Sequence, residues 1–198
     1  MSKATEHLRS DFIISGLIDK FGELTLKGSE SPFEDLVNSI IGQQLSGKAA
    51  TVISKRVEAL LSGNLSAASI LTVPDCELRK VGVSNKKASY IKNLANAVER
   101  NVINLKSIKK LDDEDIIKQL TAIKGIGRWT AEMFLLFSLA REDVYSLGDG
   151  GLSRSINKLY SKGKPLGRGE ITEITSKWRP YRSYASLYLW RALDADNQ

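Results

Sequence analysis

An isolated aspartate, Asp149, stands between glycines in the segment SLGDGGL and is the side chain best suited to catalysis. The only histidine is His7 and the only cysteine is Cys76, which excludes a four-cysteine zinc site, a four-cysteine iron–sulfur cluster and an internal disulfide. A carboxylate can stabilise a developing positive charge or orient a water molecule. The competing interpretation is structural, because Asp after a turn very often caps a helix.

A glycine hairpin, KGIG, lies upstream of that aspartate and opens a helix. Gly125 and Gly127 permit positive φ and let backbone N–H groups approach another molecule closely. A helix expected from Arg128 directs its N-terminal amides and positive dipole end to the same place, which suits a phosphate. The alternative is an ordinary turn between two helices in which glycine serves only as a C-cap.

Helical periodicity runs through nearly the whole chain and predicts the elements that position these residues. Ser31, Pro32 and Glu34 form a capping-box pattern that starts one helix, which breaks near the segment GQQLSG. Ser84 is expected to cap a later helix. Alternating strand patterns are scarce, and the best strand candidate is short, around Leu24 to Leu26. The sequence therefore predicts an all-α fold.

The helix expected from Arg128 to about Ala140 is apolar nearly all round, which predicts a buried position in the middle of the protein. Trp129 and Met133 are one turn apart and share a face, so they either line a cavity near the hairpin or belong to the core. The stretch from Arg141 to Gly148 is long enough, if extended, to run back along much of this helix. Asp149 is therefore expected to return towards the hairpin.

The length and the charge of the chain limit its domain organisation and the kind of partner it binds. A chain of 198 residues can bury a substantial core without a metal or disulfide. No linker or repeat is visible, so we expect a single unit over residues 1–198 with two helical lobes. Lys and Arg exceed Asp and Glu by 29 to 23, giving a formal charge of +6 that favours a polyanionic partner. The polar N-terminus and the lack of a long apolar run predict an intracellular protein, nuclear in a eukaryote and cytoplasmic in a prokaryote.

Two segments in order, KGIGRWTAEMFLLFSL and DVYSLGDGGL, resemble the helix-hairpin-helix and Gly/Pro-rich-loop-plus-Asp signature of the base-excision DNA glycosylase superfamily. The segments SIIGQQLSGKAA, LRKVGVSNKKASYIKNLA and WRPYRSYASLYLWRAL are similar to its 3-methyladenine DNA glycosylase II branch. The resemblance extends from about residue 30 to residue 193, with the hairpin motif at about 112–140. It implies a compact two-lobed helical bundle with an active-site cleft between the lobes.

The resemblance implies that Asp149 is catalytic and stabilises positive charge on the deoxyribose as the glycosidic bond breaks. Members that also cut the strand carry a lysine nucleophile where this chain has Trp129, so a monofunctional enzyme that leaves an abasic site is implied. Its substrates would be alkylated purines such as 3-methyladenine and 7-methylguanine, flipped out of double-stranded DNA by a monomer. No cofactor is implied, apart from a monovalent cation bridging hairpin carbonyls and a DNA phosphate.

Two alternatives stay open. One is a non-catalytic DNA-binding or damage-sensing module, since Gly150 replaces the larger apolar residue that relatives often carry beside the aspartate. The other is a glycosylase for a different lesion, such as uracil, hypoxanthine or ethenoadenine.

The resemblance places four residues at the base pocket: Trp129, Met133, Trp178 and Tyr181. Aromatic faces around a cationic base would contribute about 0.5–2 kcal/mol by cation–π attraction. Tyr184, Tyr188 and Trp190 are assigned to the core instead.

The expected DNA contacts fall in two turns. Gln44 or Leu45 in the GQQLSGK turn would fill the gap left by the flipped base, with helix-turn packing as an equal alternative for Leu45. The expected backbone contacts are Lys48, Lys124, Gly125, Ile126, Gly127, Arg128 and Thr130.

Overall fold

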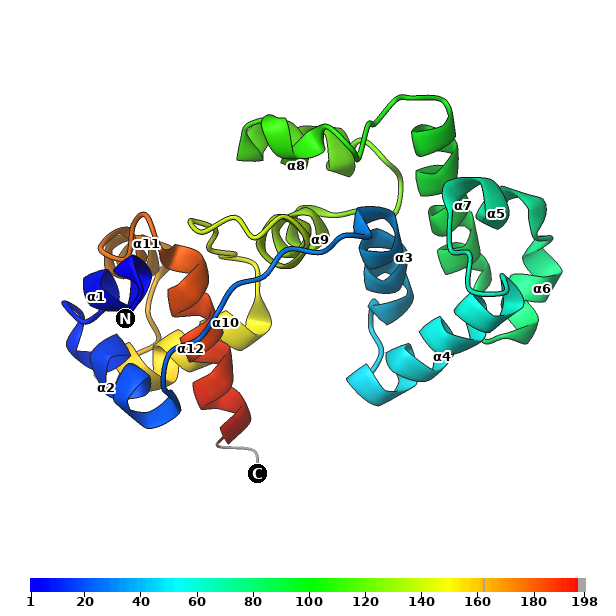
Figure 1. Cartoon of the computed structure of the whole chain (residues 1–198). Coiled ribbons are helices and arrows are strands. Elements are labelled where there is room, and N and C mark those ends of the chain that lie inside the picture. The colour runs from blue at the N-terminus through cyan, green and yellow to red at the C-terminus, as the bar shows by residue number, and fades with distance from the viewer. Residues whose placement is uncertain (162, 196–198) are drawn as a thin grey trace. The chain divides into compact units, whose positions relative to one another are not determined.

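The computed structural model describes residues 1–161 and 163–195, and within those residues every regular element is helical (Figure 1). The predicted all-α class is therefore confirmed. The strand candidate, Leu24 to Leu26, lies in the non-helical stretch between α2 (Phe12–Phe21) and α3 (Pro32–Gly42). Within the described ranges no helix is long and apolar enough to cross a membrane. The chain forms two compact units.

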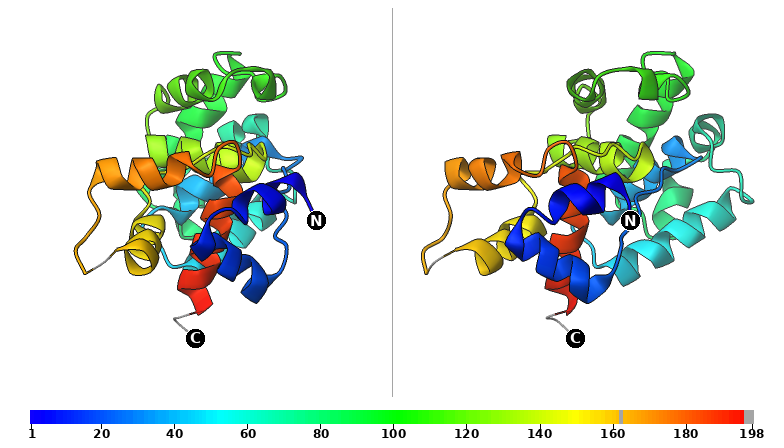
Figure 2. Two further views of the ribbon diagram at one scale, coloured as in Figure 1. Left: turned by 90° about the vertical axis from the view of Figure 1, so that its left-hand side faces the viewer. Right: turned by 60° about the vertical axis from the view of Figure 1, so that its left-hand side comes forward.

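The first unit combines Met1–Gly28 with Leu135–Gln198. A π-helix over Phe134–Ser138 lies at its boundary. In this unit α12 packs against both α2 and α10, and Figure 2 shows α12, in red, beside α2, in blue. Its α-helices are α1 (Lys3–Leu8), α2, α10 (Gly150–Tyr160), α11 (Arg168–Ser176) and α12 (Arg182–Ala195).

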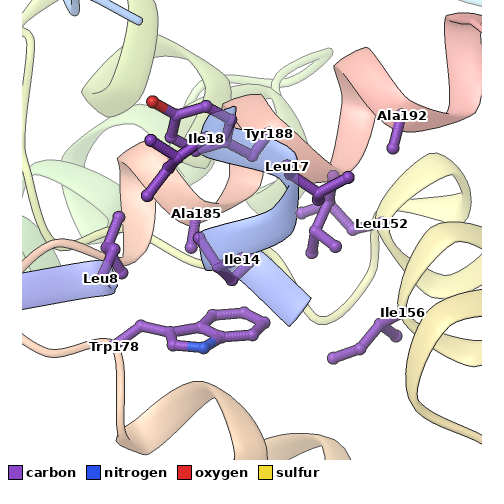
Figure 3. Close-up of a cluster of buried hydrophobic side chains, with 11 residues drawn as sticks. Leu8, Ile14, Leu17, Ile18, Leu152, Ile156, Trp178, Ala185, Tyr188 and Ala192 are labelled. Carbon is purple, nitrogen blue, oxygen red and sulfur yellow. The ribbon is translucent and has the colours of Figure 1, made fainter. Parts of the chain in front are cut away.

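Trp178 is a large, fully buried side chain in the core of the first unit, with 1% of its surface exposed. Figure 3 shows its ring facing Ile14, with Leu8 to one side and Ile156 to the other. Tyr188 of α12 joins the same cluster and donates its hydroxyl hydrogen to the Gly22 carbonyl at 3.0 Å. The predicted core role of Tyr188 is confirmed.

The second unit is the continuous segment Ser29–Phe134. Within it α7 packs against α3, α5 and α6, and α8 packs against α9. Its α-helices are α3, α4 (Gly47–Leu60), α5 (Ala67–Thr72), α6 (Asp75–Lys80), α7 (Asn85–Glu99), α8 (Asp113–Thr121) and α9 (Arg128–Met133).

The predicted helix starts in the second unit are largely confirmed. Ser84 caps α7 by accepting the Lys87 N–H at 3.4 Å, and Pro32 is the first residue of α3. Ser31 precedes α3, but among the described residues its side chain makes no capping bond there. Pro32, whose ring already fixes a helical φ, therefore starts α3 without the predicted capping box.

Candidate active site and nucleic-acid interface

The hairpin between α8 and α9 is braced by two amide side chains of the second unit. Gln43 donates Nε2–H to the Gly125 carbonyl at 2.9 Å, and Asn93 donates Nδ2–H to the Lys124 carbonyl at 3.2 Å. Both bonds satisfy backbone oxygens that a tight turn leaves without a helical partner. Gln43 thereby couples the GQQLSG turn to the hairpin, although the two segments are far apart in sequence.

Gly125 occupies the hairpin position that requires glycine. Its φ is +112°, and a Cβ built there would lie 2.2 Å from Cγ of Tyr90. The Tyr90 ring thus packs directly against the hairpin backbone, where even a methyl group does not fit. Gly127 differs, because its φ is −91° and no atom lies within 4 Å of a built Cβ, measured over the described residues.

Gly125→Ala is expected to lower the free energy of unfolding by about 2 kcal/mol or more, because strain at positive φ adds to displacement of the Tyr90 ring. Urea unfolding followed by circular dichroism measures the change. Gly127→Ala is the matched control and should change the free energy by less than about 0.5 kcal/mol. Equal losses in the two variants would contradict this account of the hairpin.

The first turn of α9 presents backbone amides at the hairpin. Gly127 is the N-cap, and no described side chain caps this end of the helix. The first amides of a helix have no carbonyl partner within it, and they carry the positive end of its dipole. The chain continues from α9 directly into the π-helix, so the helical run extends from Arg128 to Ser138. This arrangement suits a phosphate oxygen.

Two of the predicted backbone contacts are placed differently. The Arg128 guanidinium donates to both carboxylate oxygens of Glu114, at 2.6 and 3.1 Å, and to Glu132 Oε1 at 2.9 Å. Its charge is therefore directed at carboxylates of α8 and α9 in this structure rather than outwards to a phosphate. The side chain of Thr130 is buried, so only its backbone N–H belongs to the exposed first turn.

The remaining hairpin and turn candidates are accessible apart from Ile126, which is buried. Gln44 is exposed and has φ of +58°, a left-handed conformation that costs a non-glycine residue about 1 kcal/mol and is common at functional sites. Leu45 is 40% exposed, so it is not a packed turn residue. The turn is anchored by Lys87, whose Nζ donates to the Ile41 carbonyl at 2.7 Å, and burial lowers the pKa of Lys87.

Asp149 is the N-cap of α10 and is 8% exposed. Its Oδ1 accepts the Leu152 N–H at 2.7 Å and the Trp190 Nε1–H at 3.0 Å. The capping interpretation is therefore correct, and it is compatible with catalysis because two donors fix the orientation of the carboxylate. Trp190, predicted to lie in the core, packs against the core cluster of the first unit and also donates to this carboxylate.

Small and aromatic residues enclose the Asp149 carboxylate. A Cβ at Gly151 would lie 3.1 Å from both Asp149 Oδ1 and Trp190 Nε1, so glycine leaves the room that this bond needs. The Phe137 ring stacks on Trp190 with centroids 5.7 Å apart. Burial, and then the charge of Asp149, raise the pKa of Tyr145. Trp190 and Gly151 are site residues that our sequence interpretation missed.

The segment before Asp149 is held on the start of α12. Asp143 accepts from Arg182 Nε at 2.6 Å and from Arg179 Nη1 at 2.9 Å. Ser183 Oγ accepts the Val144 N–H at 2.9 Å. Because α12 also carries Trp190, one helix anchors the loop at one end and the carboxylate at the other.

The four base-pocket candidates are divided between the units. Trp129 and Met133 lie on α9 in the second unit, where Trp129 is 43% exposed and offers an aromatic face. Tyr181 lies in the first unit and contacts the rings of His7 and Tyr184.

Trp178 is placed in the core rather than on an open pocket wall. Its Nε1–H donates to Asp11 Oδ2 at 2.9 Å, and Asp11 also caps α2. Packing on all sides leaves its ring no face for a base in this structure.

Trp178→Phe is expected to lower the free energy of unfolding by about 1–3 kcal/mol, through the lost hydrogen bond to Asp11 and the lost packing. The rate of base release at a temperature where the variant is folded should stay within about threefold of wild type, a barrier change below about 0.7 kcal/mol. Thermal unfolding and a base-release assay on the same preparation measure both quantities. A large loss of rate with unchanged stability would return Trp178 to the pocket.

Metal ligation has no support in the described residues, which contain no group of three His, Cys, Asp or Glu side chains placed to hold an ion.

Comparisons with known proteins cover most of this chain. Residues 37–180 match the model of the HhH-GPD superfamily of base excision DNA repair proteins. A crystal structure of a DNA-3-methyladenine glycosidase from Bacillus halodurans is 40% identical, with a TM-score of 0.87 over 97% of this chain and 89% of that one. Schizosaccharomyces pombe 3-methyladenine DNA glycosylase Mag1, solved with abasic DNA, is 30% identical, with a TM-score of 0.86 over 96% of both chains.

Curated relatives extend the match in sequence. DNA-3-methyladenine glycosylase 1 of Schizosaccharomyces pombe is 33% identical over 165 residues, which cover 82% of this chain and 72% of that protein. A Bacillus subtilis relative is 27% identical, and the aligned region covers 66% of its length.

Proposed function

The chain belongs to the HhH-GPD superfamily of base excision DNA repair proteins, and from this premise we propose that it is a monofunctional DNA glycosylase acting as a monomer on double-stranded DNA. It hydrolyses the N-glycosidic bond of alkylated purines such as 3-methyladenine and 7-methylguanine and leaves an abasic site. The observation that supports this best is the carboxylate of Asp149, held by Leu152 N–H and Trp190 Nε1–H.

The chemistry requires a negative charge more than a strong acid. An N3- or N7-methylated purine is cationic and leaves as a neutral base, so positive charge develops on the deoxyribose ring. A carboxylate about 4 Å from that charge, at an effective dielectric constant of about 20, contributes about 4 kcal/mol. That energy corresponds to roughly a thousandfold in rate. Asp149 supplies the charge, and the same carboxylate orients the attacking water.

Each unit carries candidate base contacts. In the second unit Trp129 offers an exposed aromatic face for a cationic base, with Met133 on the same helix, and in the first unit the candidate is Tyr181. Gln44, already in a left-handed conformation, and Leu45, which is 40% exposed, are the two candidates for the gap left by the flipped nucleotide.

A monovalent cation at the hairpin remains part of the proposal. Gly125 and Lys124 carbonyls each accept one side-chain amide, and the Ile123 carbonyl accepts the Ile126 N–H at 3.1 Å. Each carbonyl oxygen keeps a second lone pair, so these oxygens fit a hard cation. Bound there, the ion would add positive charge beside a DNA phosphate.

Product analysis tests the proposal. Duplex DNA methylated at purines is incubated with the protein, and mass spectrometry should find free 3-methyladenine and 7-methylguanine together with strands that break only after alkali. Release of uracil, hypoxanthine or ethenoadenine instead would assign a different lesion, and binding without release would favour a damage sensor.

Borohydride trapping tests the monofunctional assignment separately. With Trp129 in place of a lysine nucleophile, no covalent protein–DNA adduct should form while base release proceeds. A trapped adduct that migrates with the protein on a denaturing gel would contradict it.

A further inference from the structure

A cavity of about 370 Å³ lies in the second unit between α7 and the chain from α8 to the hairpin. Asn93, Asn96 and Arg100 line it from α7 and its C-terminal end, and Gln119 and Lys124 line it from the other side. Figure 1 shows the chain leaving α7, forming α8 and returning towards α9 through the hairpin. The volume is within the range of ligand sites, about 300–1,000 Å³.

The charges of the lining are all positive. Arg100 and Lys124 are its ionisable side chains, and within residues 1–161 and 163–195 neither side chain makes a hydrogen bond or an ion pair. Two helices end next to lining residues: α7 ends at Glu99, before Arg100, and α8 ends at Thr121, before Ala122. Each contributes at most about half a negative charge, against two full positive charges from the side chains. The site therefore favours an anion.

The asparagine side chains in the lining are aligned with Arg100 along α7. Asn93, Asn96 and Arg100 are spaced three and four residues apart, so they lie along one face of the α7 end. Asn93 also bonds the Lys124 carbonyl at 3.2 Å, which joins the row to the hairpin. Asn96 likewise donates Nδ2–H to the Lys92 carbonyl at 2.9 Å, so each of the two amides keeps one N–H for a ligand. These N–H groups and the Arg100 guanidinium suit oxygens of a phosphodiester and its sugar.

The exposure of the lining side chains favours a strand of DNA over a free small molecule as the ligand of this cavity. Val102 in the lining is 71% exposed, and the side chains of Arg100, Gln119 and Lys124 are exposed as well. A small ligand is usually held by burying most of its surface, which this open site does not do. A DNA strand already gripped at the hairpin needs no enclosure, because it presents a phosphate for every step along its length.

We propose that this cavity is a second DNA-backbone site, in which Arg100 and the amides of Asn93 and Asn96 bind a phosphate and deoxyribose flanking the segment held by the hairpin. The inference rests on the proposed function in that it takes DNA as the ligand. It adds a contact beyond the hairpin that lengthens the strand covered by the protein.

Fluorescence anisotropy with Arg100→Gln tests the proposal, using duplexes that carry a central abasic analogue and are extended stepwise on either side of it with undamaged base pairs. For the longest duplex the variant should bind about three- to tenfold more weakly than wild type, and the slope of log affinity against log salt should fall by about one. For the shortest duplex the two proteins should bind equally. Arg56→Gln, which removes an exposed arginine of α4, is the matched control and should bind every duplex as wild type does.

Three outcomes would overturn the second site. Equal losses for Arg100→Gln and Arg56→Gln would show only a general charge effect. A loss independent of duplex length would place Arg100 at the hairpin contact. NMR titration with inorganic phosphate or dAMP that shifts the Asn93 and Asn96 amides, without an Arg100 effect on duplex binding, would assign a free nucleotide. Base release is measured in a separate assay. A lack of base release would refute the proposed function without changing what the anisotropy experiment says about the second DNA-backbone site.

Discussion

Asp149→Asn is expected to lower the single-turnover rate of methylpurine release by about 10²- to 10³-fold. Asparagine keeps an oxygen that can accept from Leu152 N–H and Trp190 Nε1–H, so the α10 cap and the contact with α12 survive. Asparagine lacks the negative charge that stabilises the positive charge developing on the deoxyribose. DNA affinity and the unfolding transition should remain close to those of wild type.

Asp149→Ala separates the charge from the cap. It removes the bonds from Leu152 N–H and Trp190 Nε1–H and should cost about 1–2 kcal/mol of stability in addition to the rate. Comparable stability of Asp149→Asn and wild type, with activity lost, would attribute the loss to charge alone. A rate for Asp149→Asn within about threefold of wild type would leave Asp149 as only a helix cap, since that is a barrier change below about 0.7 kcal/mol.

Gly127→Asp is expected to weaken DNA binding by about tenfold or more while leaving the fold as stable as wild type or slightly more stable. Gly127 is the N-cap of α9, with extended backbone and, among the described residues, open space around a built Cβ. Aspartate there would cap the uncapped amides and complement the helix dipole, adding about 0.5–1 kcal/mol. The same carboxylate would occupy the place that the proposal gives to a phosphate.

Two measurements on one preparation test the prediction for Gly127→Asp: thermal unfolding gives its stability, and anisotropy with an abasic-analogue duplex gives its DNA affinity. Gly127→Asn is the matched control, because it caps the helix without a charge and should lose less affinity. Unchanged binding by Gly127→Asp would show that the start of α9 does not contact the DNA backbone.

The fold and the local geometry of the motif were predictable because they depend on short-range rules. Helical periodicity predicted an all-α chain, and the GDGGL pattern predicted a helix start at Asp149, which the structure has. Gly125 was recognisable as a turn glycine, and its φ of +112° confirms that. The helix from Arg128 was also predicted, although its change to a π-helix after Met133 has no signal that we recognise.

The errors concern side chains whose role depends on which distant element they meet. Trp178 and Trp190 are both aromatic residues near the C-terminus. Only the packing of α12 against α2 and α10 buries Trp178 fully and brings Trp190, which packs on the same core, to Asp149. A buried indole N–H needs an acceptor, so the sequence could have predicted an aspartate partner for each tryptophan. It could not have predicted which aspartate each tryptophan meets. Glu132 is four residues after Arg128, and that spacing was a readable sign of the ion pair.

The most direct test of the glycosylase assignment is the release of N3-methyladenine from a single defined duplex, with protein in excess, compared with spontaneous loss in buffer. The protein should release the base far faster than the spontaneous reaction does, with one abasic site formed for each base released and no strand break before alkali. Tight binding of the duplex with base loss at the spontaneous rate would contradict it and make the protein a sensor of DNA damage.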